Sequence, residues 1–326
     1  MIYLQHESMD PFFWFGLEQA LLQKAAPEDD YFLLWRTEPT LMIGNYQIAA
    51  AEINEAYALR RNIHIVRRQT GGGTIFTDPG SWQFSYIMRR REHHEIAFKP
   101  FVQPVLDALR AMGVEANMSA RNDLLVDGRK FCGNAQHHSG NRVLHHGSIL
   151  FDTDIDEMVR CLTVDDEKII SKGIRSVRQR VTNLKEHIKE QMDATAFRDR
   201  LLKEMFLGSA KTRALTQEEL ALADRAAEQK FRSWDWTYGK APNCKVTRSK
   251  RLNGGKVEVC MDVDKGVIAN CSIYGDFFFA GELDAVTERL KGCPYTVHSV
   301  QETLHHALKA HPFYLIETQE LMECMF

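Results

Sequence analysis

The segment from Arg67 to Phe76 reads R-R-Q-T-G-G-G-T-I-F and joins two arginines to three consecutive glycines. Glycine costs roughly 0.5–1 kcal/mol relative to alanine inside regular structure, so a triplet between strands indicates a close backbone approach or a positive φ. Backbone N–H groups and the Arg68 guanidinium both complement phosphate oxygens, so one interpretation is an anion site. The other is a glycine-rich hairpin without a ligand, and this motif alone does not separate the two. No G-K-[ST] follows and no G-x-G-x-x-G opens a helix, which disfavours the common nucleotide-binding folds.

A second segment could place a carboxylate beside an ammonium. Residues 121–136 read R-N-D-L-L-V-D-G-R-K-F-C-G-N-A-Q, and Asp127-Gly128 is typical of a tight hairpin turn. Such a turn puts Asp123 and Lys130 on paired strands, where their side chains can share one site. Asp123 would then suit a metal that carries nucleotide phosphates, and Lys130 would neutralise charge on an attacked phosphate or carbonyl. The alternative is an exposed ion pair worth ~0–1 kcal/mol.

Two further segments are polar. His137-His138 and His145-His146 are adjacent pairs. Neighbours in a strand point to opposite faces, so we favour pocket lining or surface placement over a metal site. Residues 171–183 read S-K-G-I-R-S-V-R-Q-R-V-T-N, which indicates either a solvated loop-to-helix transition or a mobile cover over phosphates.

The elements that must hold these segments are strands and helices in mixed order. Asp10-Pro11 is typical of a helix start. Apolar spacing predicts helices at residues 12–24, 52–60, 100–112, 154–162 and 195–230. Short apolar or alternating runs predict strands at residues 31–35, 41–43, 62–67, 74–76, 82–88, 124–126, 143–151 and around Phe131. Turn residues between Trp234 and Pro242 suggest a domain boundary near residue 245. Beyond it, we expect strands at 256–263 and 266–274 and helices at 283–290 and 300–308.

The composition is that of a globular protein. The 326 residues exceed the ~100–200 typical of one domain, and 44% are hydrophobic. A net charge of −3 does not indicate the basic surface that nucleic-acid binding requires. No apolar run reaches the ~18–20 residues that span a membrane. Seven scattered cysteines without a C-x-x-C predict no disulfide framework and no thiolate zinc site. With no export signal visible, a reducing, cytoplasmic location fits best.

Three segments in this order resemble those of the lipoate–protein ligase A family: residues 67–78, residues 121–136 and H-H-G-S-I-L-F-D at 145–152. The similarity continues through S-V-R-Q-R-V-T-N-L at 176–184. W-T-Y-G-K-A-P at 236–242 and I-Y-G-D-F-F at 273–278 resemble the accessory domain of the full-length ligases. The resemblance implies an α+β fold. Residues 1–245 would form a biotinyl/lipoyl protein ligase catalytic domain, similar to that of class II aminoacyl-tRNA synthetases, and residues 246–326 a small α+β accessory domain.

The resemblance also implies an ATP-dependent reaction in two steps. Lipoate attacks the α-phosphate of MgATP to give lipoyl-adenylate and pyrophosphate, and an acceptor lysine then attacks the adenylate. Lys130 matches the family's essential lysine and would act in both steps. The implied ATP or adenylate contacts are Arg68, Gly73, Thr74, Ile75, Phe76, Asn122, Asp123 and Lys130. The implied lipoyl contacts are Thr70, Gly71, Gly72, Lys130, His146 and Gly147. Asp123 is also the candidate ligand for Mg²⁺, and residues 171–183 match a loop that closes over the adenylate.

The acceptors that the resemblance implies are apo lipoyl domains of 2-oxoacid dehydrogenase E2 subunits, the glycine cleavage H protein, or both, with no nucleic-acid or membrane partner. Three residues depart from the family pattern. Thr70 replaces the usual serine and keeps a hydroxyl, whereas Thr77 stands where histidine is common, which puts any role of that imidazole in doubt. We interpret Cys132 as a small packed residue rather than a nucleophile, because the motif assigns it no base.

Other functions remain to be weighed against the ligase. A cofactor-free octanoyl or lipoyl transferase or amidotransferase of the same fold would use a cysteine thioester. Residues 117–123, where such relatives carry the cysteine, read N-M-S-A-R-N-D and contain none, which favours the ATP-dependent enzyme. A biotin ligase fits the R-R-x-[ST]-G-G-G and H-H-G segments less well. A binding protein without activity is disfavoured because Arg68, Asp123 and Lys130 are all present.

Overall fold

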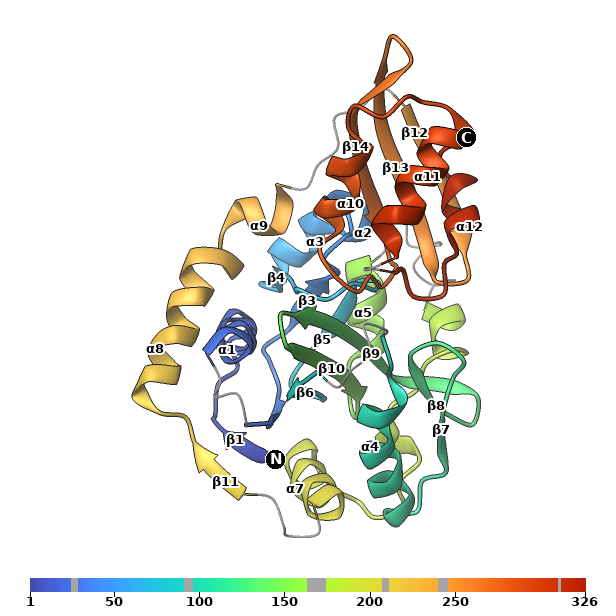
Figure 1. Ribbon diagram of the computed structural model, residues 1–326. Coiled ribbons are helices and arrows are strands. Elements are labelled where there is room, and N and C mark those ends of the chain that lie inside the picture. The colour runs from blue at the N-terminus through green and yellow to red at the C-terminus, as the bar shows by residue number, and fades with distance from the viewer. Residues whose placement is uncertain (25–28, 91–95, 163–173, 207–210, 240–245, 310–311) are drawn as a thin grey trace.

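The computed structural model describes residues 1–24, 29–90, 96–162, 174–206, 211–239, 246–309 and 312–326 (Figure 1). Its main body, residues 1–239, is built on an eight-stranded sheet of order β11-β1-β2-β6-β10-β9-β8-β7. These strands are β1 (Ile2–Gln5), β2 (Tyr31–Trp35), β6 (Ser81–Arg89), β7 (Ala116–Met118), β8 (Asp123–Val126), β9 (Arg129–Ser139), β10 (Arg142–Leu150) and β11 (Lys211–Ala214). The pairing is antiparallel except at β11-β1-β2, which is parallel.

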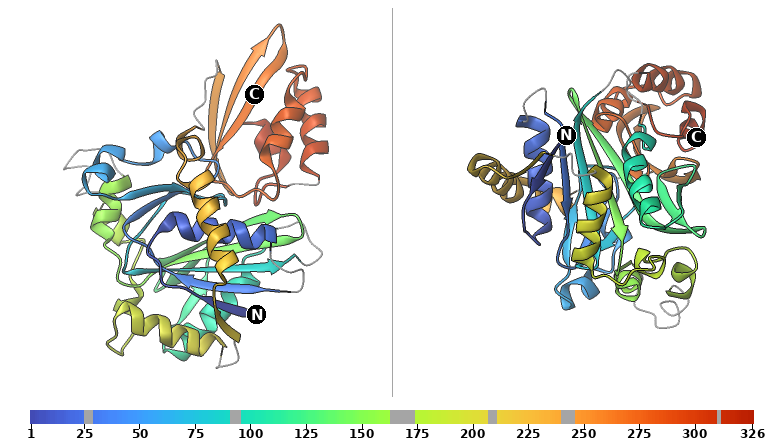
Figure 2. Two further views of the ribbon diagram at one scale, coloured as in Figure 1. Left: turned by 90° about the vertical axis from the view of Figure 1, so that its left-hand side faces the viewer. Right: turned by 90° about the horizontal axis from the view of Figure 1, so that it is seen from below.

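Helices cover both faces of this sheet (Figure 2). Helices α1 (Pro11–Lys24) and α8 (Gln217–Ala226) pack together on one face, whereas α4 (Lys99–Ala111) and α7 (Ala194–Phe206) pack on the other. Side chains of β6 alternate between these faces, because Phe84 joins the core beneath α4 while Ser85 bonds to Glu18 of α1. On the α1 face, Ser85 of β6 and His146 of β10 both meet Glu18 of α1.

A smaller sheet holds the glycine triplet. Its order is β4-β3-β5, from β3 (Thr40–Ile43), β4 (His64–Arg67) and β5 (Ile75–Thr77). The triplet lies between β4 and β5, so two ordered strands fix both ends of that loop. The short helices of this region and of the chain that follows are α2 (Ala49–Glu52), α3 (Glu55–Arg60), α5 (Ile155–Leu162), η1 (Leu184–Glu186), the π-helical turn η2 (Ala227–Phe231) and α9 (Trp234–Tyr238).

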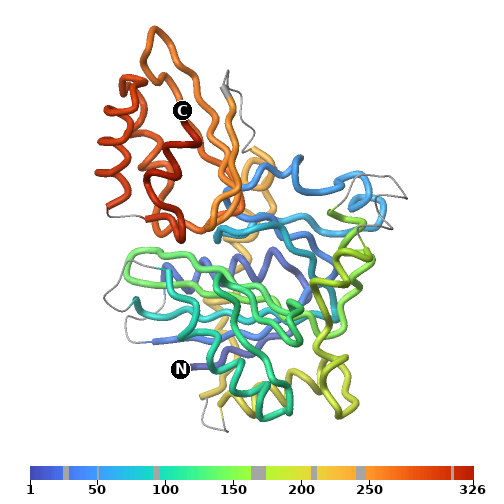
Figure 3. Tube along the Cα trace, turned by 90° about the vertical axis from the view of Figure 1, so that its right-hand side faces the viewer, coloured from blue at the N-terminus to red at the C-terminus, as the bar shows by residue number. Residues whose placement is uncertain are grey.

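Residues 246–326 form a C-terminal unit with its own hydrophobic core, seated on the main body near the glycine triplet (Figure 3). It contains a three-stranded antiparallel sheet, β12 (Val246–Leu252), β13 (Gly255–Asp264) and β14 (Val267–Gly275), and the helices α10 (Leu283–Leu290), α11 (Val297–Leu308) and α12 (Thr318–Met322). The α+β class with a small α+β C-terminal part is thus confirmed. The boundary at 245 stays a prediction, because residues 240–245 lie outside the described ranges.

One expectation from the sequence was wrong. The predicted helix over residues 195–230 is divided into α7, the edge strand β11, α8 and η2. The sequence K-T-R-A of β11 is largely exposed and has no apolar alternation, so only its pairing with β1 makes it a strand. The scattered cysteines predicted no disulfide framework; among the described cysteines, Cys260 is disulfide-bonded and Cys132, Cys161, Cys271, Cys293 and Cys324 are free. Among the helices that the structure describes, none could span a membrane.

Candidate active site

A cavity lies between the α1 face of β9 and β10, the glycine triplet and the C-terminal unit. Its walls are formed by Phe15, Trp35, Met42, Arg68, Gly72, Gly73, Thr74, Ile75, Gln83, Asn122, Lys130, Gly133, Asn134, Ala135, His146, Gly147, Ser148 and Phe278. The lining combines aromatic side chains, among them Phe15, Trp35 and Phe278, with the polar side chains of Lys130 and Asn122. Such a cavity suits a ligand that has an apolar part and an anionic part.

The predicted hairpin forms and brings Asp123 and Lys130 together. Asp127 and Gly128 take φ of 49° and 73°, as a two-residue turn with two positive φ values requires. The Lys130 Nζ lies 2.7 Å from the Asp123 Oδ1. A bulge in the register between β8 and β9 accompanies this meeting. A Cβ at Gly133 would lie 3.0 Å from the Lys130 Nζ, so the glycine leaves room for the ammonium group.

The main chain of Lys130 is held by the basic segment. Its N–H donates to the Arg180 carbonyl at 2.7 Å, and its carbonyl accepts from the Thr182 N–H at 2.9 Å. Lys130 and Val181 thereby form a parallel bridge. Residues 171–173 of the basic run lie outside the described residues, and its closure over an adenylate stays a prediction. Nothing in the sequence predicted the contact between this run and the Lys130 backbone.

Arg68 shapes the glycine loop from within. Its guanidinium donates to the Met42, Gly71 and Gly73 carbonyls and to the Thr70 Oγ1 at 2.7–3.0 Å. Burial lowers the pKa of Arg68 to about 9, so the group stays cationic near neutral pH. Because Arg68 also lines the cavity, its contact with ATP stays a prediction alongside this observed structural role.

The first two glycines of the triplet meet the C-terminal unit. The Gly72 N–H donates to the Phe277 carbonyl at 3.1 Å, and a Cβ at Gly71 would lie 2.2 Å from that oxygen. Gly72 also has a φ of 89°, as the sequence indicated for one of these positions. The close approach seen here is to protein backbone, while the predicted lipoyl contacts of Gly71 and Gly72 stay predictions.

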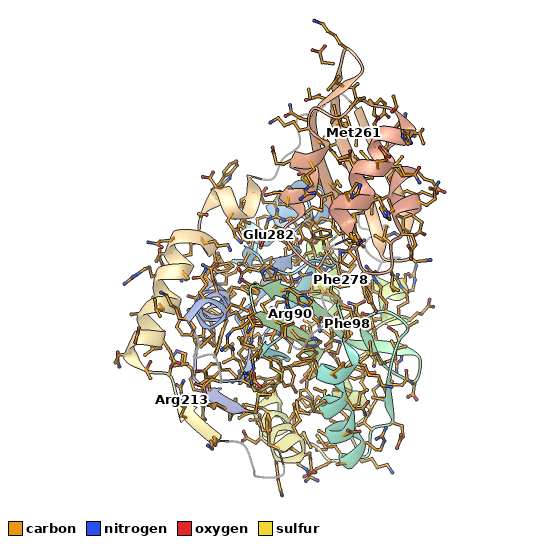
Figure 4. All side chains as sticks on the ribbon, viewed as in Figure 1. Arg90, Phe98, Arg213, Met261, Phe278 and Glu282 are labelled. Atoms are coloured by element: carbon orange, nitrogen blue, oxygen red, sulfur yellow. The ribbon has the colours of Figure 1, made fainter. Side chains whose placement is uncertain are left out.

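Phe278 enters the cavity from the C-terminal unit and lies beside Phe98 of the main body (Figure 4). The two ring centroids are 5.4 Å apart, and the Arg121 guanidinium stacks on Phe278 at 5.4 Å from its centroid. Arg121 also donates to the Gly254 and Asp276 carbonyls. Arg121 of the R-N-D segment therefore joins the two units beside the cavity.

The remaining predicted residues fall into three groups. Gly73, Thr74, Ile75, Asn122, His146 and Gly147 line the cavity. Thr70 and Asp123 contact lining residues through their side chains, whereas Phe76 is packed among Leu41 and Ala58 in a separate core. Thr77, the departure from the family pattern, is buried and shares a hydrogen bond with Thr37. Cys132 is buried in the main core, where burial raises the pKa of its thiol.

The adjacent histidines point to opposite faces of β10, as expected. His145 stacks on Phe101 beneath α4, with ring centroids 4.6 Å apart. His146 faces the cavity, where its Nε2 lies 2.8 Å from the Thr70 Oγ1 and its Nδ1 lies 3.1 Å from the Glu18 Oε1. The described part of the chain contains no cluster of three or more histidine, cysteine, aspartate or glutamate side chains suited to a metal.

The sequence did not predict most of the apolar residues that line the cavity, and it did not single out Glu18. Phe15, Trp35, Met42 and Phe278 lie in four different elements or loops, and no motif joins them. Glu18 did carry a signal, because it is a charged residue among the buried positions of an apolar helix. A charged residue is seldom fully buried unless it is paired with another group.

Lys230 and Glu282 both line a second, polar cleft between the main body and the C-terminal unit. The Lys230 Nζ donates to the Gln19 and Gln69 side chains and lies 4.1 Å from the centroid of the Trp236 ring. Burial lowers the pKa of Lys230 from 10.5 to about 8. The buried charge therefore opposes folding below about pH 8.

We predict that this penalty is relieved as the pH rises from about 8 to 10.5. In that window the unfolded chain binds more protons than the folded one, so the free energy of unfolding increases with pH. Lys230→Met should abolish that increase, which we expect to be about 2 kcal/mol after allowance for partial exposure. Urea titrations of both proteins at pH 7 and pH 10 measure it. Equal pH dependence in the two proteins would contradict the prediction.

Known proteins match both parts of the chain. Residues 10–206 match the family model described as lipoyl protein ligase A/B catalytic domain, and residues 241–325 match the one described as bacterial lipoate protein ligase C-terminus. The chain is 34% identical to lipoate-protein ligase LplJ of Bacillus subtilis, with 100% of each chain covered. It is 33% identical to lipoate–protein ligase 1 of Staphylococcus aureus, with 97% of each covered.

Solved structures show the same fold. P. falciparum LipL1 in complex with lipoate matches with a TM-score of 0.78 at 21% identity, covering 99% of this chain and 97% of that one. A lipoate-protein ligase A bound with ATP matches with a TM-score of 0.64 at 22% identity, covering 74% of this chain and 99% of that one. Full-length similarity at this level, with both family models matched in order, means that the chain belongs to the lipoate–protein ligase family.

Proposed function

We propose that this ATP-dependent lipoate–protein ligase forms lipoyl-adenylate in the cavity and passes the lipoyl group to a lysine of an acceptor lipoyl domain. The observation that carries the proposal is the position of Lys130. Lys130 lines a cavity whose walls also carry the aromatic side chains of Phe15, Trp35 and Phe278, and its ammonium group is held by Asp123. A fatty acid with a ring at its tail would place its carboxylate beside Lys130 and its hydrocarbon chain against Trp35 and Phe15.

In the first step, a carboxylate oxygen of lipoate bonds to the α-phosphorus of ATP, and pyrophosphate leaves. In the second step, the acceptor amine bonds to the acyl carbon, AMP leaves with the bonding electrons, and the amine gives up a proton to solvent. Both steps build negative charge on an oxygen next to the reacting centre, and the Lys130 cation stabilises that charge. Asp123, 2.7 Å away, holds the ammonium group in place.

Magnesium enters the proposal with the nucleotide. The residues fit such an ion, because Mg²⁺ in nucleotide sites commonly takes one or two carboxylates and completes its shell with phosphate oxygens and waters. Asp123 is the carboxylate next to Lys130, and its side chain is partly exposed. When bound, the ion would neutralise phosphate charge. We therefore keep Asp123 as its proposed protein ligand.

We propose E2 lipoyl domains or the glycine cleavage H protein as acceptors and the cytoplasm as the location. A solved relative of similar fold is described as an archaeal bi-partite lipoate protein ligase with its E2 lipoyl domain from Thermoplasma acidophilum. That description concerns the archaeal protein. A panel of apo acceptor proteins, each incubated with this enzyme, would identify which one it prefers.

The proposal is tested with purified protein, MgATP, lipoate and an apo lipoyl domain. We expect pyrophosphate release and an acceptor heavier by one lipoyl group, both dependent on ATP. Transfer without ATP would overturn the adenylation step and favour a transferase. Pyrophosphate release without transfer would show an adenylating enzyme that needs another partner. Neither product in the presence of all four components would refute the proposal as a whole.

A further inference from the structure

Glu18 is a fully buried acid on the α1 side of the cavity. Its Oε1 accepts two hydrogen bonds, whereas its Oε2 has no partner within the described part of the chain. A carboxylate in this position costs stability, because removal from water is compensated at only one oxygen. Because the buried Glu18 carboxylate lowers stability, its presence indicates a role other than stabilising the fold.

One chain of hydrogen bonds runs from the glycine loop to Glu18. The Arg68 Nε donates to the Thr70 Oγ1 at 3.0 Å, the Thr70 Oγ1 lies 2.8 Å from the His146 Nε2, and the His146 Nδ1 lies 3.1 Å from the Glu18 Oε1. Arginine can only donate, and an ionised carboxylate can only accept. Because the Glu18 carboxylate accepts, the His146 Nδ1 carries a proton and donates it to Glu18. The Thr70 hydroxyl can donate to the His146 Nε2 while its oxygen accepts from Arg68.

A second chain reaches the same oxygen from another wall of the cavity. The Trp35 Nε1 donates to the Ser85 Oγ at 2.9 Å, and the Ser85 hydroxyl donates to the Glu18 Oε1 at 2.6 Å. Indole N–H is a donor only, so the direction of this chain is also fixed. Trp35, Arg68 and His146 all line the cavity, so the two chains connect three of its wall residues to one buried carboxylate.

We propose that Glu18 is a positioning residue of the lipoyl pocket, which holds the Nδ1–H of His146 toward itself and thereby orders the walls formed by Trp35 and the glycine loop. The inference rests on the proposed function for the identity of the ligand. Successive donors that all point to one anion polarise one another, so the loss of that anion affects both chains. Glu18 itself lies behind the wall and acts through His146 and Ser85.

The test compares Glu18→Met with Glu18→Gln in the full-length protein. Methionine has a similar volume and offers no carbonyl or carboxylate oxygen, whereas glutamine keeps a neutral acceptor at the same place. Long-range ¹H–¹⁵N spectra of ¹⁵N-histidine protein report the tautomer, and a His146→Gln sample assigns the signal. We expect Nδ1–H in the wild type and in Glu18→Gln, and a change to Nε2–H in Glu18→Met.

Kinetics supply the second measurement. We expect Glu18→Met to raise KM for lipoate about tenfold, by analogy with the scale seen when the hydrogen-bond partner of a metal-binding histidine is lost, with kcat changed less than about twofold. Glu18→Gln should recover most of that loss. Glu204→Gln, an acid-to-amide change on α7, should leave the His146 signal and the KM at their wild-type values.

The outcomes separate this inference from the proposed function. If Glu18→Met keeps the Nδ1–H signal of His146, or leaves KM for lipoate unchanged, Glu18 does not position the pocket. Should Glu18→Met fail to fold, a Glu18→Gln protein with the wild-type tautomer and a near wild-type KM supports the inference, and one with the Nε2–H form overturns it. A wild type that binds no lipoate would refute the proposed function, while the tautomer comparison would still decide the role of Glu18.

Discussion

Lys130→Ala is expected to slow pyrophosphate release and lipoyl transfer at least about 10²–10³-fold each, the range seen when one preorganised group that stabilises an oxyanion is removed. In the proposed mechanism the same ammonium group stands next to the oxygen on which charge develops in both steps. Pyrophosphate is measured with a coupled assay, and transfer from pre-formed lipoyl-adenylate is followed by the mass of the acceptor. The two measurements isolate the first step from the second.

A matched lysine provides the control. Lys185 makes an exposed ion pair with Asp152 on the far side of the basic segment, so Lys185→Ala should leave both rates within about twofold. If Lys130→Ala slows only the transfer from pre-formed adenylate, its role is confined to the second step. If Lys130→Ala slows neither step, Lys130 does not stabilise the reacting oxygen, and the mechanism under the proposed function is wrong.

Arg67→Met is expected to lower the free energy of unfolding by about 3–5 kcal/mol, because it leaves several buried carbonyls without a donor. Arg67 is fully buried, and its guanidinium donates to five main-chain carbonyls at 2.7–3.2 Å. Those carbonyls belong to Gly44, Asn45, Gln47, Trp236 and Thr237. The side chain thus joins the strand before the glycine triplet to α9, the last described helix of the main body.

Guanidinium denaturation, followed by tryptophan fluorescence and circular dichroism, measures the change. Arg110→Met is the matched control, since Arg110 is more than half exposed and pairs with Asp107 on the surface of α4. We expect that control to unfold at nearly the wild-type midpoint. An Arg67→Met protein as stable as the control would show that water replaces the guanidinium at these carbonyls.

The pairing of Asp123 with Lys130 could be predicted because the two residues are near neighbours in the sequence. Asp127-Gly128 specifies a turn by its local conformational preference, and the turn alone brings Asp123 and Lys130 to one place. The positive φ at Gly72 follows from the same local reasoning. Short-range rules of this kind need no knowledge of how the rest of the chain folds.

The rest of the site depends on contacts between segments far apart in the sequence. Phe278 meets Gly72 only because the C-terminal unit docks there, and Trp35, Ser85, His146 and Glu18 converge from three strands and a helix. Tertiary pairing also overrides local preference at β11, which reads as part of a helix. These long-range contacts cannot be predicted from the spacing of residues in a single sequence.

The main-chain clamp on Lys130 has a consequence for anyone who redesigns this enzyme. Because Arg180 and Thr182 hold Lys130 through backbone atoms only, the side chains at positions 180 and 181 can be varied in a library without displacing the lysine. Chain length there is not free in the same way, since one inserted or deleted residue would shift the bridge by a full position. Libraries that aim to change acceptor choice should therefore vary the residue types of this segment and keep its number of residues constant.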